Sequence, residues 1–273
     1  MADITAIILT LNEEKNIEEC IRSAKQIASR IIVVDSGSTD STVQLAQKFG
    51  AETVYHQWET HSRQFNWALD NCNISTTWVF RLDADERITI KLAEEINYIL
   101  SSENVNKYSG FQMRWQIVFM GRILKHGGIH KPYFLRLFRF GQGRATDTIM
   151  DEHIVVDGET AKLQNDLLHY DYKGLDEWLK KHISYSNLEI NQYYKNIDSC
   201  QTNNKQLKRR SFYYSLPLFI RAKLYYWFRY YWQLGFLDGR EGKIFIYLQA
   251  YWYRFLVDAK ILEQSRNQGN QNE

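Results

Sequence analysis

The sequence has only two prolines and three cysteines in 273 residues, and these shortages exclude several protein classes. The cysteines, Cys20, Cys72 and Cys200, are scattered, odd in number and without a C-x-x-C pair, which argues against a disulfide framework or a cysteine zinc site. With 44% hydrophobic residues and little proline, the chain also lacks the composition of disordered or collagen-like proteins. We therefore expect a globular protein of a reducing compartment.

Long apolar runs are missing as well. The longest charge-free candidates, residues 211–220 and 244–253, are 10 residues each and are bounded by Arg or Lys, whereas a bilayer span needs about 20 residues. The first residues carry no basic segment of the kind that opens a secretory signal. The sequence therefore predicts a cytoplasmic protein that does not cross a membrane.

The common phosphate-binding loops are absent too. No G-x-x-x-x-G-K-[ST] motif occurs, and no G-x-G-x-x-G follows the first apolar run at residues 4–10. Neither a P-loop nucleotidase nor an ordinary dinucleotide site is supported. If the protein binds a nucleotide, it must hold the phosphates by other means.

Short β runs alternate with helical patterns over the first hundred residues. The expected strands are 4–10, 31–34, 53–56 and 78–82, and the expected helices are 17–28, 43–49, 62–72 and 91–100, with Asn12 as a cap of the first helix. This alternation is typical of an α/β fold with a parallel sheet. Strand-like segments at 111–119, 133–140 and 149–156 predict a mixed or antiparallel extension, so we expect one domain over residues 1–175 and a helical region over 176–273.

Polar clusters follow three of the expected strands, where ligands of open parallel sheets bind. They are Thr10-Leu11-Asn12-Glu13, residues 35–40, and Asp83-Ala84-Asp85-Glu86. Residues 35–40 could instead cap a helix, although capping explains only one of their two aspartates. The third cluster could be a solvated acidic turn, but three carboxylates repel one another unless a cation offsets them. A Mg²⁺ or Mn²⁺ ion bridging a diphosphate is the simplest compensation.

The order of these motifs resembles the inverting glycosyltransferases of family 2. The matching segments are the strand ending at residues 10–14, residues 35–40, the helix with Arg63, Asn66 and Ala68, and Asp83-Ala84-Asp85. Residues 121–128, 135–139, 151–158 and 168–170 further resemble the bacterial branch that builds lipopolysaccharide cores. The resemblance implies a GT-A fold, a Rossmann-like mixed α/β sheet that binds a nucleotide-diphosphate sugar. We expect a C-terminal helical membrane-associating extension to follow it, on the composition described below.

The resemblance also implies roles for individual residues around the donor. The donor site would comprise Thr10, Asn12, Glu13, Asp35, Ser38, Arg63 and Asp83. Glu13 and Asp35 would contact ribose and base, and Asp85 would bind the metal directly, with Asp83 contacting ribose or binding the metal through water and His169 as a further ligand. Arg63 could instead form a surface ion pair, and a lone histidine on a strand is more often structural.

An inverting transfer needs a base to take the proton of the acceptor hydroxyl. The resemblance places this base in the pair Asp151-Glu152. Glu152 matches the His-Glu pattern of the family better, but an aspartate stands here where the histidine often does, so both residues remain candidates. The alternative is an exposed turn at the sheet edge.

The C-terminal part is basic and rich in aromatic residues. Residues 205–260 carry 11 basic and 3 acidic side chains, against 22 and 27 in residues 1–204, and 18 of the 40 aromatic residues lie between 212 and 255. Interfacial helices use this mixture, since rings sit at headgroup depth while Lys and Arg meet lipid phosphates. We expect docking on an anionic membrane surface, at the inner face of the cytoplasmic membrane. The alternatives are a helical subdomain packing its rings internally and, less expected, nucleic-acid binding.

These observations together predict an enzyme class. We expect a metal-dependent, inverting, non-processive transfer of sugar from a nucleotide-diphosphate sugar to a lipid-linked or oligosaccharide acceptor, because the chain lacks the membrane spans and Q-x-x-R-W motif of processive synthases. A sugar-phosphate nucleotidyltransferase would need a glycine-rich loop after the first strand. A non-catalytic membrane-docking or carbohydrate-binding protein would leave Asp83, Asp85 and Glu152 without a role.

Overall fold

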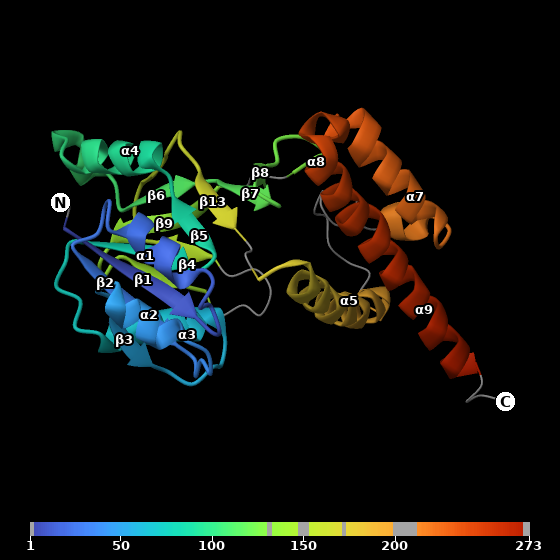
Figure 1. Ribbon diagram of the computed structural model, residues 1–273, viewed down its shortest axis with the longest axis horizontal. Helices are drawn as coiled ribbons and strands as arrows, with labels where there is room; N and C mark the ends of the chain where they lie inside the picture. The colour runs from blue at the N-terminus through green and yellow to red at the C-terminus, as the bar shows by residue number, and fades with distance from the viewer. Residues whose placement is uncertain (1–2, 130–132, 147–152, 171–172, 199–211, 270–273) are drawn as a thin grey trace. The chain divides into compact units, whose positions relative to one another are not determined.

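The computed structural model describes residues 3–129, 133–146, 153–170, 173–198 and 212–269 (Figure 1). The chain forms two compact units, Met1–Val118 with Lys131–Tyr172, and Phe119–His130 with Lys173–Glu273. Residues 119–130 thus belong to the second unit, whereas the sequence-based division places a single boundary at residue 175. Asp238 holds this segment in place, because its carboxylate accepts the backbone N–H groups of Lys125 and His126, each at 2.8 Å.

A seven-stranded mixed sheet forms the centre of the first unit, in the order β12-β6-β9-β4-β1-β2-β3. The first four strands in the chain run parallel, whereas β9 is antiparallel to both β4 and β6. The predicted α/β fold with a mixed extension is confirmed. The strands are β1 (Ile4–Thr10), β2 (Arg30–Asp35), β3 (Glu52–Tyr55), β4 (Trp78–Asp83), β6 (Gly110–Met113), β9 (Phe134–Arg139) and β12 (Thr160–Lys162).

Helices cover both faces of this sheet, so the central strands are apolar on both sides. Ile8 of β1 belongs to a core that includes Ile21 of α1 (Ile17–Ala24) and Leu92 of α4 (Ile90–Leu100). Ile7, the residue before Ile8, faces the other side of the sheet and belongs to a second core with Phe65 of α3 (His61–Asn71). The remaining helices of this unit are α2 (Thr42–Lys48) and the 3-10 helix η1 (Glu103–Lys107).

Two smaller sheets complete the first unit. One joins β5 (Glu86–Ile88), β13 (Leu167–Tyr170) and β7 (Trp115–Phe119), with β13 in the middle. The other pairs β10 (Gly143–Ala145) with β11 (Ile154–Val156). β11 is the described part of the strand expected at 149–156.

The second unit is helical, as predicted, and contains the short strand β8 (Arg122–Ile123). No helix among its described residues, or elsewhere in the described chain, is both long and apolar enough to cross a membrane. Its helices are α5 (Leu175–Asp198), α7 (Ile220–Trp227), the π-helix η2 (Phe228–Trp232), the 3-10 helix η3 (Gly235–Asp238), α8 (Gly239–Ile246), the π-helix η4 (Tyr247–Trp252) and α9 (Tyr253–Gly269).

Two arginines of the basic, aromatic C-terminal part, which the sequence predicts to meet lipid phosphates, are buried inside the second unit. Arg221 is 1% exposed and forms a 2.5 Å ion pair with the equally buried Asp258. Arg229 is 4% exposed and donates from Nε to the carbonyl oxygen of Gly127 at 2.6 Å. The expectation of lipid contact is wrong for these two residues, because the tertiary packing supplies acceptors inside the unit. Lys208, Arg209 and Arg210 lie outside the described residues.

Candidate active site

The carboxyl ends of three adjacent strands bring the predicted polar clusters together. In the β1–β2 ladder Thr10 is the partner of Asp35, and in the β1–β4 ladder Leu9 is the partner of Asp83. Ligands of open α/β sheets bind at this edge. The structure therefore brings the predicted polar clusters to one edge of the sheet.

Asp35 organises the turn after β2. Its Oδ2 accepts the N–H groups of Gly37 and Ser38, each at 2.8 Å, and its Oδ1 accepts the hydroxyls of Thr10, at 3.1 Å, and Ser38. Gly37 has φ +101, a backbone conformation that favours glycine. Asp35 thus shapes the loop and does not cap α2, where the carboxylate of Asp40 instead accepts the N–H of Thr42 at 3.0 Å.

The loop after β1 is tied to this turn by hydrogen bonds. Asn12 donates its N–H to the Ser38 hydroxyl at 2.8 Å and accepts the Thr39 N–H on its side-chain oxygen at 2.8 Å. Glu13 donates its N–H to the Thr42 hydroxyl at 2.7 Å. The predicted capping role of Asn12 is wrong, because its φ of +54 turns the chain five residues before α1 begins at Ile17. Five of the predicted donor residues, Thr10, Asn12, Glu13, Asp35 and Ser38, form one connected loop pair.

Arg63 lies on the outer surface of α3. Its guanidinium pairs with Glu59 at 2.8 Å, and both side chains are about half exposed, 55% and 49%. The inward-facing polar residues of this helix are Gln64, which donates to the Val34 carbonyl at 3.3 Å, and Asn66, which exchanges two hydrogen bonds with the backbone of Ala145. In the sequence, Gln64 stands four residues before the apolar Ala68, and this helical spacing is the signal that indicates its inward position.

The acidic turn after β4 is compensated by arginine. Nη2 of Arg136 lies 2.6 Å from Glu86 and 3.1 Å from Asp83, and Nε of Arg81 lies 3.8 Å from Asp83. Glu86 is only 2% exposed, so the alternative of a fully solvated acidic turn is wrong. The repulsion between the carboxylates therefore does not by itself require a metal ion. Arg136 lies within residues 135–139, which carry part of the family resemblance, but the local sequence pattern gives no sign of this role.

Burial and charge move the two carboxyl groups in opposite directions. Burial raises the pKa of Glu86 to about 7, although Arg136 opposes the shift. Burial acts in the same sense on Asp83, but Arg136 and Arg81 outweigh it and hold the pKa of Asp83 well below its usual range. Asp83 is therefore an anion at neutral pH, at the edge where a donor would bind.

Asp85 and His169 lie close together, as the predicted metal site requires. Nδ1 of His169 is 3.5 Å from Oδ1 of Asp85, and the Tyr170 N–H donates to the Asp85 carbonyl at 2.7 Å. Within the described part of the chain, no group of three or more His, Cys, Asp or Glu side chains is arranged to hold a metal ion. Mg²⁺ bound to a diphosphate uses only one or two carboxylates, so Asp85 with His169 fits an ion of that kind.

A cavity of about 350 Å³ adjoins Asp83. The residues that line it come from β4, β6, β7, β9 and β11 and their neighbours, and they are Arg81, Asp83, Gln112, Trp115, Tyr133, Phe134, Leu135, Arg136, His153 and Ile154. Asp151 and Glu152 lie outside the described residues. Glu152 directly precedes His153 in the chain, which is a lining residue.

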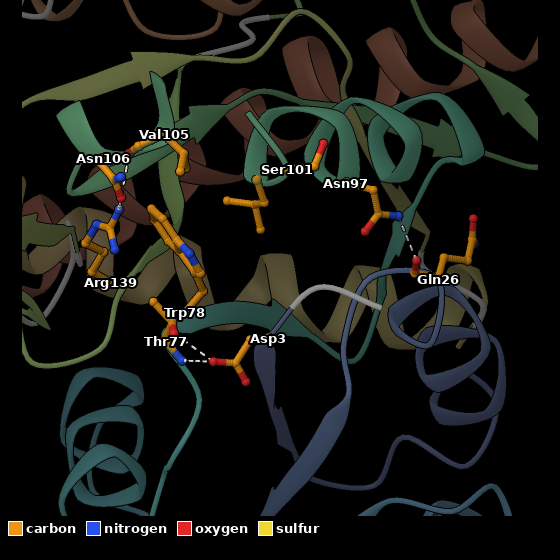
Figure 2. A pocket seen from close by; sticks show the side chains of 10 residues that line it. Asp3, Gln26, Thr77, Trp78, Asn97, Ser101, Val105, Asn106 and Arg139 are labelled. Carbon is orange, nitrogen blue, oxygen red and sulfur yellow. Dashed lines mark hydrogen bonds between the residues drawn. The ribbon is translucent and has the colours of Figure 1, made fainter. Parts of the chain in front are cut away.

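A larger cavity, of about 740 Å³, opens at the opposite ends of the strands (Figure 2). Its polar groups bond to one another: Asp3 accepts the Thr77 N–H at 2.7 Å, and Arg139 donates to the side chain of Asn106 at 3.2 Å. None of the predicted site residues lines this cavity.

Comparison with known proteins identifies the family of the chain. The family described as glycosyl transferase family 2 matches residues 5–151. An uncharacterized glycosyltransferase of Rickettsia bellii is 38% identical over 130 residues, which are 48% of this chain and 43% of that protein, so the chain matches less than half of that relative's length. The lipopolysaccharide core biosynthesis glycosyltransferase LpsC of Rhizobium meliloti is 29% identical over 265 residues, 90% of each chain.

Among solved structures, glucosyl-3-phosphoglycerate synthase from Mycobacterium tuberculosis, crystallised with Mn²⁺, uridine diphosphate and glucosyl-3-phosphoglycerate, is 24% identical. The match covers 43% of this chain and 44% of that one, with a TM-score of 0.32. This overlap is partial and carries no argument about activity. The family match spans more than half of the sequence and includes the three strand ends that form the site, and the chain belongs to glycosyl transferase family 2.

Proposed function

We propose that this protein is an inverting, non-processive, metal-dependent glycosyltransferase with a GT-A fold, acting at the cytoplasmic face of a membrane. The observation that carries the proposal is the placement of Asp35 at the end of β2 and of Asp83 and Asp85 at and just after the end of β4, the two strands that flank β1, with Asp83 lining a cavity large enough for a small ligand. Family membership and the 90% overlap with a lipopolysaccharide core glycosyltransferase support it.

The donor would be a nucleotide-diphosphate sugar bound over β1 and β2. The connected loops at residues 10–14 and 35–42 present a hydrogen-bonded surface. The Glu13 carboxylate would accept hydrogen bonds from ribose hydroxyls, whereas Asp35, whose oxygens already accept four hydrogen bonds, would contact the base by exchanging one of them. Asp83 would contact the ribose, and Arg63 would reach the base or the diphosphate after leaving its pair with Glu59. The sugar of the donor would then lie near Asp83 and Asp85.

Asp85 would hold a Mg²⁺ or Mn²⁺ ion, with His169 as a further ligand and Asp83 acting through water. When bound, the ion would neutralise the diphosphate leaving group. Arg136 keeps Asp83 ionised and in place, because its guanidinium donates to both Asp83 and Glu86. This chain's own contribution is therefore an anionic turn held by the buried Arg136, with the buried Arg81 also close to Asp83.

Glu152 or Asp151 would take the proton of the acceptor hydroxyl as that oxygen attacks the anomeric carbon from the side opposite the diphosphate. The attack forms the new glycosidic bond as the bond to the diphosphate breaks, which inverts the configuration. The position of Glu152 in the sequence supports this assignment, because it directly precedes His153, a residue that lines the cavity beside Asp83.

The acceptor would be a lipid-linked or oligosaccharide substrate of cell-surface glycan synthesis, most simply a lipopolysaccharide core, as the name of the Rhizobium relative suggests. The second unit would dock on an anionic membrane through exposed apolar and basic side chains. Apolar residues there are 50% to 56% exposed at Leu224, Trp227 and Tyr231, and Lys223 and Lys243 are exposed nearby in sequence. This surface replaces the internal Arg221 and Arg229 in the docking hypothesis.

A nucleotide-release assay tests the proposed function directly. The full-length protein is incubated with a panel of nucleotide-diphosphate sugars, MnCl₂ and a membrane extract as the acceptor source, and the released nucleotide is measured. We expect release with one donor, stimulation by the extract and loss in EDTA. Release from none of the donors, or equal release in EDTA, contradicts the proposal.

A further inference from the structure

The cavity beside Asp83 lies on the opposite side of β4 from the loops assigned to the donor. In the sheet order, β1 and β2 lie on one side of β4, whereas β9 and β6 lie on the other. β9 is antiparallel to β4, with Phe80 opposite Leu137, so the start of β9 at Phe134 lies toward the carboxyl end of β4. Asp83 thus stands between two binding regions.

The wall of this cavity contains an ordered aromatic group. The rings of Trp115 and Phe134 are parallel, with an angle of 4° and centroids 5.6 Å apart, and the tilted ring of His169 lies 5.4 Å from that of Trp115. Trp115 and Phe134 are both half-buried, so the neighbouring rings limit their rotation while part of each surface faces the cavity. A ring face of this kind attracts the C–H groups that a pyranose presents on its apolar side.

Polar groups at the base of the cavity can bind sugar hydroxyls. Nε of Arg136 is buried and has no hydrogen-bond partner among the described residues, although its Nη2 binds Asp83 and Glu86. The Asp83 side chain remains 34% exposed, so it can still accept a hydrogen bond from a hydroxyl group. The volume of about 350 Å³ falls in the usual range for small-molecule sites, about 300–1,000 Å³.

We infer that this cavity binds the acceptor, as a saccharide whose terminal pyranose stacks on Trp115 and whose hydroxyls meet Asp83 and Arg136. The inference rests on the proposed function, since it names where the second substrate of that reaction binds. It adds Trp115 and Phe134 as residues that determine acceptor specificity. The donor sugar would approach Asp83 from β1 and the acceptor from β9, so the two reacting groups would meet above one carboxylate.

The binding test uses the full-length protein labelled with 5-fluorotryptophan and ¹⁹F NMR. The Trp115 signal is assigned by its loss in Trp115→Phe, and the Trp58 signal, from a tryptophan packed on His61 outside the cavity, is assigned by Trp58→Phe. The probes are the methyl pyranosides of glucose, galactose and mannose at millimolar concentrations, and UDP with MnCl₂. We expect at least one pyranoside to shift the Trp115 signal but not the Trp58 signal, and to do so with UDP and Mn²⁺ present.

Two results would overturn the inference. One is a Trp115 signal that none of the pyranosides shifts. The other is a pyranoside shift that UDP and Mn²⁺ abolish, because the cavity would then belong to the donor. Neither result depends on nucleotide release, so a failure of this site is distinguishable from a failure of the proposed function.

Kinetics with the active donor give a second measurement. Trp115→Ala should raise the KM for acceptor roughly tenfold or more, whereas the KM for donor should stay unchanged. Trp115→Phe should recover part of the loss, because a ring face remains, and Trp58→Phe should behave as wild type. An unchanged acceptor KM in Trp115→Ala would contradict stacking on this residue.

Discussion

Arg136 Nη2 lies 2.6 Å from Glu86 Oε1 in a setting where neither side chain is more than 10% exposed. The same nitrogen donates to Asp83 at 3.1 Å, so one guanidinium serves two carboxyl groups. Burial raises the pKa of Glu86 to about 7, above the ordinary value of 4.5. Between these values the folded protein holds a proton that the unfolded chain has released, so the contribution of Glu86 to stability falls as pH rises through this window.

We predict that Arg136→Met destabilises the protein more in weak alkali than in weak acid. At about pH 8 the variant leaves Glu86 ionised, buried and without its partner, and the free energy of unfolding should fall by about 3–5 kcal/mol. At about pH 5 Glu86 holds a proton, so the loss should be smaller. Urea unfolding at both pH values measures the difference.

The matched control is Arg144→Met, which removes a surface arginine paired with Asp70 at 2.7 Å, where both side chains are more than half exposed. An exposed pair contributes about 0–1 kcal/mol, so this variant should change little at either pH. Equal losses for Arg136→Met at both pH values would show that Glu86 does not take up the proton.

Asp85→Ala should abolish sugar transfer and weaken the Mn²⁺-dependent binding of UDP. Without this carboxylate the metal ion would bind more weakly, so the negative charge of the diphosphate would be poorly neutralised. Calorimetric titration with UDP, with and without MnCl₂, measures the binding step apart from catalysis. Asp70→Ala removes a carboxylate from the surface of α3 and should bind UDP as wild type does. Full activity of Asp85→Ala would remove this residue from the metal site.

Glu152→Gln should lower kcat by about a hundredfold or more while the affinity for donor is kept, because the amide has nearly the same shape but cannot accept a proton. Asp151→Asn should cost less. Steady-state rates with each variant, together with donor binding, separate the two residues. The reverse order would identify Asp151 as the base, and two active variants would make the pair structural.

The full-length protein should bind, through its second unit, to liposomes that contain anionic lipid and should float with them. Added salt should weaken this binding because it screens the charges. The double substitution of Leu224→Ser with Trp227→Ser should lower vesicle binding at least roughly tenfold, since each side chain loses its buried area in the interface. Tyr98→Ser, at a tyrosine on α4 that is 77% exposed, is the matched control. Full-length protein that stays unbound at low salt would contradict membrane docking.

Local patterns in the sequence were enough to place most elements of the first unit. The strand expected at residues 4–10 is β1 without change, and the helix expected at 91–100 differs from α4 by one residue. Both are long, regular apolar patterns, so local preference and burial agree. The first helix ends at Ala24, whereas the sequence predicts its end at residue 28. Ile27 and Ala28 are nevertheless buried, so the apolar pattern continues beyond the end of the helix.

By itself the sequence determined the α/β class, the parallel order at the start of the chain and the three polar clusters, because hydrophobic periodicity and strand-end position are local properties. Only the tertiary structure decided which charges compensate one another. Arg136 reaches Asp83 and Glu86 across some 50 residues of sequence, and Arg221 reaches Asp258 across 37. Such pairs arise from strand order and helix packing, and no local pattern specifies them. For the same reason the sequence showed a basic aromatic segment, whereas the fold decided which of its described arginines are buried.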